Sequence, residues 1–218
     1  MERKQFLGRV KSALRGARLP DVSGPGAAPA IVFDDPVARF VVEAEAVASD
    51  VVRVSDAAAA LDALAAVFEL AGTSEFLAWD GLDEILPGWD GWVEESGMTR
   101  VDASIGADQQ QRHDDNARVG GVSVGVTTAD WAVASSGSLV LSHGPGRPRS
   151  ASLLVEHHVA MLPANRVVNS LAEALGKTSW DDNSNIAVIT GPSRTGDIES
   201  ILTIGVHGPR RVHIVVLD

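Results

Sequence analysis

Residues 190–199 have the types and order that suit the binding of an anion. They read Thr-Gly-Pro-Ser-Arg-Thr-Gly-Asp-Ile-Glu and follow an apolar run at 186–189. A buried strand that ends in a turn of small and polar residues is a common ligand site in open α/β sheets. If Ser193 or Thr195 caps a helix here, the free N–H groups attract anions. The alternative is a capped turn without a ligand. The candidate residues are Thr190, Gly191, Ser193, Arg194, Thr195 and Asp197.

A turn and a hairpin at 125–142 carry a second group of candidates. Thr128 and Asp130 lie in a Thr-Thr-Ala-Asp turn, where a carboxylate at a strand end can face a cleft. The alternative is that Asp130 bonds its own backbone as a turn residue. Alternation at 131–135, a Ser-Gly dipeptide and a second apolar run predict a hairpin. Its tip offers hydroxyl groups and close backbone approach at Ser136, Gly137 and Ser138.

The loop at 143–149 is basic, with the sequence His-Gly-Pro-Gly-Arg-Pro-Arg. Arg147 and Arg149 are candidates to clamp a carboxylate or phosphate, because guanidinium groups match the geometry of both. The alternative is a solvent loop that pairs with an acidic surface. We expect the turns at 127–130 and 190–197, the hairpin tip at 136–138 and the loop at 147–149 to converge on one cleft for a small anionic ligand.

The histidines do not form a metal site by spacing. His157 and His158 are adjacent, so on a strand their rings point to opposite faces. His207 lies in a Gly-Val-His-Gly-Pro turn and is a site candidate, whereas His213 is expected to be hydrogen-bonded in the core. No zinc or iron spacing, dinucleotide fingerprint, Walker sequence or nucleophile elbow is present.

Residues 125–141, 190–199 and the Ile-Gly-Val-His-Gly-Pro sequence at 204–209 together resemble the lactate-utilisation protein C family, which carries the LUD domain. The resemblance covers 119–218 closely and the first half in layout. It implies a NagB/RpiA/CoA-transferase-like fold and favours a role for Asp130, because the family repeats the Ala-Asp pair. Many members have an acidic residue where this chain has Ser135, which weakens the case for a glutamate nucleophile and CoA transfer.

The resemblance also implies an accessory subunit that works with iron–sulfur proteins in the oxidation of L-lactate to pyruvate. The chain has no cysteine, so it carries no iron–sulfur cluster of its own. We therefore expect no cofactor on this chain, apart from an unidentified small anion. The alternative is a free-standing enzyme of the sugar-phosphate isomerase or acyl/CoA-transfer type, which would turn over its substrate alone.

Composition limits the partners. The chain has 218 residues and a net charge of −11, and an acidic body argues against nucleic-acid binding through a broad basic face. No run is long and apolar enough to span a bilayer. The charged start, without an apolar signal core, predicts a cytoplasmic protein.

Charge and helical spacing set residues 1–18 apart as a basic amphipathic helix. One interpretation is that this helix binds an acidic partner, a membrane surface or nucleic acid. The other is a solvated helix that lies on the acidic body. Residues 19–30 read as a Gly/Pro linker and 31–218 as one LUD-type α/β domain.

The rest of the chain predicts a three-layer α/β fold with a mostly parallel sheet and an added β-hairpin, because strands alternate with helices. Helices are expected at 36–48, 56–71, 107–118 and 165–175, the last capped by Asn165. Strands are expected at 51–54, 76–79, 157–162, 186–190 and 212–217. The last two are continuous apolar runs, which suit central positions.

Overall fold

The computed structural model describes residues 3–14, 31–179, 183–196, 202–205 and 207–218. The chain divides into two compact units, Met1–Ala30 and Ile31–Asp218. In the first, helix α1 spans Arg3–Leu14 and exposes Phe6, Leu7 and Val10. The expectations of a linker at 19–30 and of a helix continuing beyond Leu14 fall outside the described residues.

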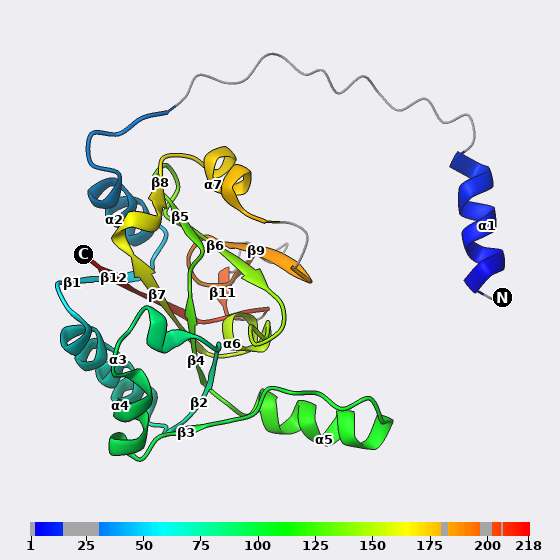
Figure 1. The fold of residues 1–218 in the computed structure, drawn as a ribbon, viewed down its shortest axis with the longest axis horizontal. Helices are drawn as coiled ribbons and strands as arrows, with labels where there is room; N and C mark the ends of the chain where they lie inside the picture. The colour runs from blue at the N-terminus through cyan, green and yellow to red at the C-terminus, as the bar shows by residue number, and fades with distance from the viewer. Residues whose placement is uncertain (1–2, 15–30, 180–182, 197–201, 206) are drawn as a thin grey trace. The chain divides into compact units, whose positions relative to one another are not determined.

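The second unit alternates helices and strands as the sequence predicts (Figure 1). Its helices are α2 (Pro36–Ala46), α3 (Ala57–Ala71), α4 (Trp89–Ser96), α5 (Gln109–Gly120), α6 (Ser150–Leu153) and α7 (Leu171–Lys177), with short 3-10 turns η1 (Leu82–Glu84) and η2 (Ala164–Arg166). Its strands are β1 (Asp50–Val54), β2 (Glu75–Ala78), β3 (Thr99–Arg100), β4 (Val124–Thr128), β5 (Trp131–Val133), β6 (Ser138–His143), β7 (His157–Pro163), β8 (Val167–Val168), β9 (Asn185–Ile189), β10 (Arg194–Gly196), β11 (Leu202–Ile204) and β12 (Arg211–Leu217).

Local sequence explains where the main helices begin. The Asp35 carboxylate accepts from the Ala38 amide and Pro36 fills the first turn of α2. Asp56 caps α3 in the same way, and Gly72 ends that helix in the left-handed conformation at φ 64°.

A six-stranded sheet forms the centre of the unit, in the order β1-β12-β7-β4-β2-β3. Every neighbouring pair is parallel. Successive residues of a strand face opposite sides, so Val159 and Met161 of β7 pack with α3 and α4, while Ala160 and Leu162 pack with α2 and the β5–β6 hairpin. The sheet therefore lies between two apolar layers, and the predicted three-layer α/β class is confirmed.

The hairpin is part of a second, four-stranded sheet with the order β8-β5-β6-β9. Strands β5 and β6 are antiparallel and pair Trp131 with Val140, which confirms the predicted hairpin. The predicted central position of the 186–190 strand is wrong, because β9 is an edge strand with Val188 exposed. Apolar residues are needed there only on the side that packs inward.

Two further expectations about local structure are wrong. The helix expected at 165–175 begins at Leu171, because Ser170 caps it by accepting from the Glu173 amide, and Asn165 lies in η2 instead. The turn after 190 leads into strand β10, which pairs with β11, so no helix begins at Ser193 or Thr195. Tertiary pairing outweighs the local capping signal at both places.

Candidate functional site

The carboxyl ends of the parallel strands bring several charged side chains to one edge of the main sheet. Asp80 follows β2, Arg100 ends β3, Asp130 follows β4, and Arg166 follows β7. Strands β7, β4, β2 and β3 follow one another in the sheet, so these residues come from adjacent positions along the edge. Ligands of open α/β sheets bind at this edge.

Asp130 is held by a cross-strand network. Its carboxylate accepts from the backbone N–H of Ser142 at 2.5 Å and from the Arg147 guanidinium at 2.8 Å. Its own amide donates to the carbonyl of Val140 at 3.0 Å. The side chain is 19% exposed. The alternative of a turn residue that bonds its own local backbone is therefore wrong: Asp130 ties the β4 exit to the β6 exit.

Arg147 is positioned by an aromatic ring as well as by Asp130. Its guanidinium lies 5.1 Å from the centre of the Trp79 ring, and the indole Nε1 of Trp79 donates to the Pro148 carbonyl at 3.1 Å. The turn before Arg147 is closed by its amide, which donates to the Gly144 carbonyl at 3.0 Å. Trp79 is fully buried, so the loop at 143–149 is anchored to the core.

A hollow of about 460 Å³ opens beside Asp130. We call it the Asp130 hollow. Three basic side chains and one acidic side chain line it, namely Arg147, Arg166, Lys177 and Asp130. Its other lining residues are Trp131, Ser142, Thr178, Ser179 and Asn183. The lining charge is positive, which favours an anion.

Arg166 and Lys177 differ in how far they are engaged. Arg166 is half-buried and donates to the Ala129 carbonyl at 3.0 Å; in the described part of the chain it contacts no carboxylate. Lys177 pairs with Glu173 at 2.9 Å and lies 5.1 Å from the Trp131 ring centre. A guanidinium has five N–H donors, so Arg166 keeps donors for a ligand.

Neither Arg166 nor Lys177 is among the site residues predicted from the sequence. A signal for Arg166 was present, because it follows the strand end at Pro163 by three residues. The erroneous helix at 165–175 obscured it. Lys177 reaches the hollow only because α7 packs against β5 and β8. No local sequence pattern predicts this packing.

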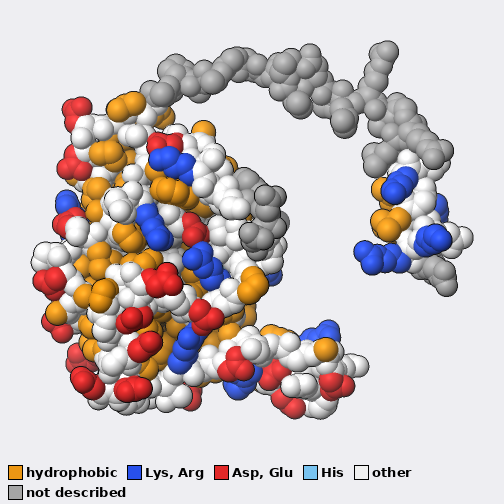
Figure 2. Space-filling model, in the orientation of Figure 1, with side chains coloured by type: hydrophobic (Ala, Val, Ile, Leu, Met, Phe, Trp, Pro, Cys, Tyr) orange, Lys and Arg blue, Asp and Glu red, His pale blue; other side chains and the backbone are white. Residues whose placement is uncertain are grey.

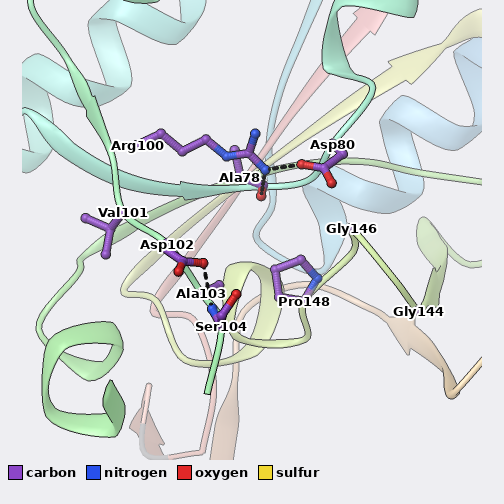
Figure 3. A pocket seen from close by; sticks show the side chains of 10 residues that line it. All are labelled: Ala78, Asp80, Arg100, Val101, Asp102, Ala103, Ser104, Gly144, Gly146 and Pro148. Atoms are coloured by element: carbon purple, nitrogen blue, oxygen red, sulfur yellow. Dashed lines mark hydrogen bonds and ion pairs between the residues drawn. The ribbon is translucent and has the colours of Figure 1, made fainter. Parts of the chain in front are cut away.

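A second hollow, of about 500 Å³, lies beyond the 144–147 turn. Figure 3 shows its lining, which we call the Asp102 hollow. Arg100 and Asp80 point toward each other and pair at 2.5 Å, and Arg100 also donates to the Ala78 carbonyl (Figure 3). The Ser104 amide donates to Asp102, and this bond, with lesser help from Arg118, holds the pKa of Asp102 below its ordinary value.

Figure 2 shows how charge is distributed over this face of the second unit. Basic side chains lie down its middle with acidic side chains beside them, while acidic side chains dominate the side where α3 and α4 lie.

The predicted hairpin-tip residues lie elsewhere. Ser136, Ser138 and Thr190 form a chain of hydroxyl contacts, 2.8 Å from Ser136 to Ser138 and 2.8 Å from Ser138 to Thr190. Gly137 lies against α2, where an added Cβ would stand 2.3 Å from the Ala44 amide nitrogen. Ser138 lies four positions before Ser142, the partner of Asp130, on β6, which is a distance of about 13 Å. The expected convergence on one cleft is therefore wrong.

The 190–195 turn packs against the end of α2. Gly191 has φ +73°, and a Cβ there would meet the Val47 carbonyl oxygen at 2.3 Å. The Arg194 guanidinium donates to the same carbonyl at 3.0 Å, and the Ser193 amide donates to the Pro209 carbonyl. Because no helix starts here, the physical basis for an anion at Ser193 and Thr195 is lost. Asp197 lies outside the described residues.

The remaining candidates are dispersed. Thr128 is buried next to the Asp130 turn, whereas Arg149 and His207 are exposed and line neither hollow. His213 is buried and contacts His157 at 3.2 Å and Asp50 at 3.3 Å, which confirms the expected core role. His158 contacts Thr127 at 2.9 Å, on the other face of β7 from His157, as predicted.

The described residues contain neither a group of side chains that could hold a metal ion nor a helix that could cross a membrane. No three His, Cys, Asp or Glu side chains are grouped so that they could hold a metal ion. Among the helices that the structure describes, none has the length and apolar character needed to cross a bilayer.

The fold and the site define an α/β protein with a polar hollow, lined by three basic side chains and one acidic side chain, at the carboxyl edge of a parallel sheet. Residues 37–217 match the LUD domain, and the chain belongs to the LUD domain family. A similar fold is found in a DUF162 family protein from Deinococcus radiodurans, with a TM-score of 0.56, 16% identity, and coverage of 84% of this chain and 97% of that one.

Several similar sequences are each called Lactate utilization protein C. The protein from Macrococcus caseolyticus is 31% identical over 172 residues, covering 72% of this chain and 67% of the relative. The one from Oceanobacillus iheyensis is 32% identical, covering 63% and 58%, and the one from Halalkalibacterium halodurans is 36% identical, covering 44% of each. The alignments thus span between 44% and 67% of the length of these relatives.

Proposed function

We propose that this chain binds a small carboxylate in the Asp130 hollow and acts as an accessory subunit of a cytoplasmic system that oxidises L-lactate to pyruvate. The observation that carries the binding proposal is the lining of the hollow, in which three basic side chains face one acidic side chain. The names of the relatives support the link to lactate.

Arg166 is the anchor of the proposed anion. Arg147 is already engaged with Asp130 and Lys177 with Glu173, so both contribute charge while their donors are partly occupied. One N–H group of the Arg166 guanidinium donates to the Ala129 carbonyl, and the others remain for a ligand. A guanidinium that forms two parallel bonds to a carboxylate gives both affinity and orientation.

Because the chain has no cysteine, the proposal includes partner proteins that accept electrons. Oxidation of lactate releases two electrons, and this chain has no thiolate to hold an iron–sulfur cluster. We therefore propose that iron–sulfur proteins receive the electrons. This chain then contributes binding and orientation of the anion within the complex.

Calorimetric titration with L-lactate, pyruvate and inorganic phosphate tests the proposal. Arg166→Gln should weaken binding of L-lactate about tenfold or more, because a charge-assisted hydrogen bond is lost. Arg210→Gln is the matched control, since Arg210 is 63% exposed, pairs with Glu156 and precedes the amino end of β12. Its affinity should equal that of the wild type.

Two results would contradict the proposal. One is an Arg166→Gln protein that binds all three anions as the wild type does. The other is turnover of a sugar phosphate or a thioester by the purified chain alone, which would favour the alternative of a free-standing isomerase or acyl-transfer enzyme.

A further inference from the structure

The two hollows border the same four-residue turn. Arg147 lines the Asp130 hollow, while Gly144, Gly146 and Pro148 line the Asp102 hollow. The Gly144–Arg147 turn is closed by backbone hydrogen bonds in both directions, at 3.4 and 3.0 Å. In a closed turn of this kind the first and last Cα atoms are less than about 7 Å apart. A single ligand of moderate length can therefore reach both hollows.

The volumes of the two hollows also favour a ligand longer than lactate. Hollows of about 460 and about 500 Å³ fall in the range of about 300–1,000 Å³ that holds drug-sized ligands. An acid as small as lactate fills only a small part of either hollow. Gly146 lines the Asp102 hollow and packs closely against Asp80, because an added Cβ would stand 2.5 Å from the Asp80 carboxylate.

Charge separates the two hollows. The Asp130 hollow has three basic side chains against one acid, whereas the Asp102 hollow has Arg100 against two acids, Asp80 and Asp102. The Arg100 guanidinium is engaged by Asp80 and the Ala78 carbonyl. Asp102 is fixed by the Ser104 amide, and the Arg118 side chain donates to the carbonyls of Asp102 and Ser104. A second anion is unfavourable there.

We infer that the site also accepts monocarboxylic acids longer than lactate: the carboxylate lies beside Arg166, and an uncharged or cationic tail crosses the 144–147 turn into the Asp102 hollow. This inference rests on the proposed carboxylate site and extends the class of acids that the site accepts. The excess of acids beyond the turn selects against a second anionic group, since like charges near each other raise the free energy of binding.

A matched set of carboxylates tests the inference by calorimetry on the full chain. Propionate probes the head group, and 8-hydroxyoctanoate, 8-aminooctanoate and suberate add a tail that is uncharged, cationic or anionic. We expect the hydroxy and amino acids to bind more tightly than propionate, and suberate to bind more weakly than 8-aminooctanoate by about fivefold or more.

The Asp102→Asn variant tests whether the Asp102 carboxylate causes the selection against a second anionic group. The amide oxygen still accepts from the Ser104 amide, so the variant should fold, and the preference for 8-aminooctanoate over suberate should shrink about fivefold. Propionate affinity should not change. Asp62→Asn, at an exposed position on α3, should keep the wild-type preference.

Failure of the inference is distinguishable from failure of the proposed function. Equal affinities for suberate and 8-aminooctanoate, or an unchanged preference in Asp102→Asn, would overturn the elongated ligand while propionate still binds and Arg166→Gln still weakens it. If the wild-type protein binds none of these carboxylates, the inference and the proposed function are both wrong.

Discussion

Asp130 shows how one carboxylate can hold a site together. It accepts a backbone amide from Ser142 and a guanidinium from Arg147, and the guanidinium in turn lies over Trp79. This chain of contacts links the exits of β2, β4 and β6 across the site. The removal of charge at Asp130 should therefore affect stability as well as ligand binding.

We expect Asp130→Asn to lower the free energy of unfolding by about 2 kcal/mol, because a charge-assisted bond to Arg147 is lost in a half-buried place. Asp80→Asn is a matched control, since Asp80 also pairs with an arginine but is 66% exposed. It should cost less than about 1 kcal/mol. Urea unfolding of both variants measures the difference, and equal costs would show that the Asp130 network adds nothing beyond a surface ion pair.

At the scale of elements, the site depends on the close approach of α6 to β4. Gly125 in β4 has no side chain, and an added Cβ would stand 1.9 Å from the Ala151 carbonyl oxygen of α6. This approach places the loop before α6, with Arg147 and Pro148, over the end of the main sheet. Glycine is needed here for space rather than for a special backbone conformation.

Gly125→Ala should therefore destabilise the protein by about 2 kcal/mol or more, because backbone atoms must move apart. Gly176→Ala is the counterpart in α7, where no atom lies within 4 Å of the added Cβ. Alanine should be neutral there or stabilise by about 0.5–1 kcal/mol through helix propensity. Thermal unfolding of the pair gives the comparison, and a neutral Gly125→Ala would mean that α6 is not tightly packed on β4.

At the scale of the whole molecule, buried histidines couple stability to pH. Burial lowers the pKa of His158 to about 3, with smaller contributions from His143 and His213. Burial also lowers the pKa of His213 to about 4, against an opposing effect of Asp50. These groups are neutral in the folded protein at neutral pH.

The sign of the pH effect follows from the unfolded chain, in which histidine has a pKa of about 6.5. Above that pH neither state binds the proton, so stability is full. As the pH falls from 6.5 toward 4, the unfolded chain takes up protons that the folded protein excludes, and stability decreases by about 1.4 kcal/mol per pH unit for each histidine.

His158→Gln keeps a side chain that can bond Thr127 but cannot titrate. The variant should show a shallower loss of stability between pH 6.5 and 4.5, by about one proton in the slope of unfolding free energy against pH. Denaturant unfolding at several pH values gives this slope even if the variant is less stable throughout. A slope equal to that of the wild type would show that His158 is not the group responsible.

The sequence by itself determined the class of the fold. Alternating apolar runs and helical spacings predicted the parallel sheet, the β5–β6 hairpin and the helix at 56–71, because these features are set by local periodicity. The turn after β4 also identified Asp130, since a carboxylate at a strand end is visible without knowing its partners.

Only the tertiary structure decided which residues share a site. Arg166 and Lys177 reach the Asp130 hollow because strands β7 and β8 and helix α7 dock beside β4 and β5, and such docking leaves no local signal. The hydroxyl groups of Ser136 and Ser138 lie at the start of β6, whereas Asp130 contacts Ser142 near its end. They are nevertheless close to Asp130 in the sequence. Register and packing fix these positions, and both depend on contacts between segments far apart in the chain.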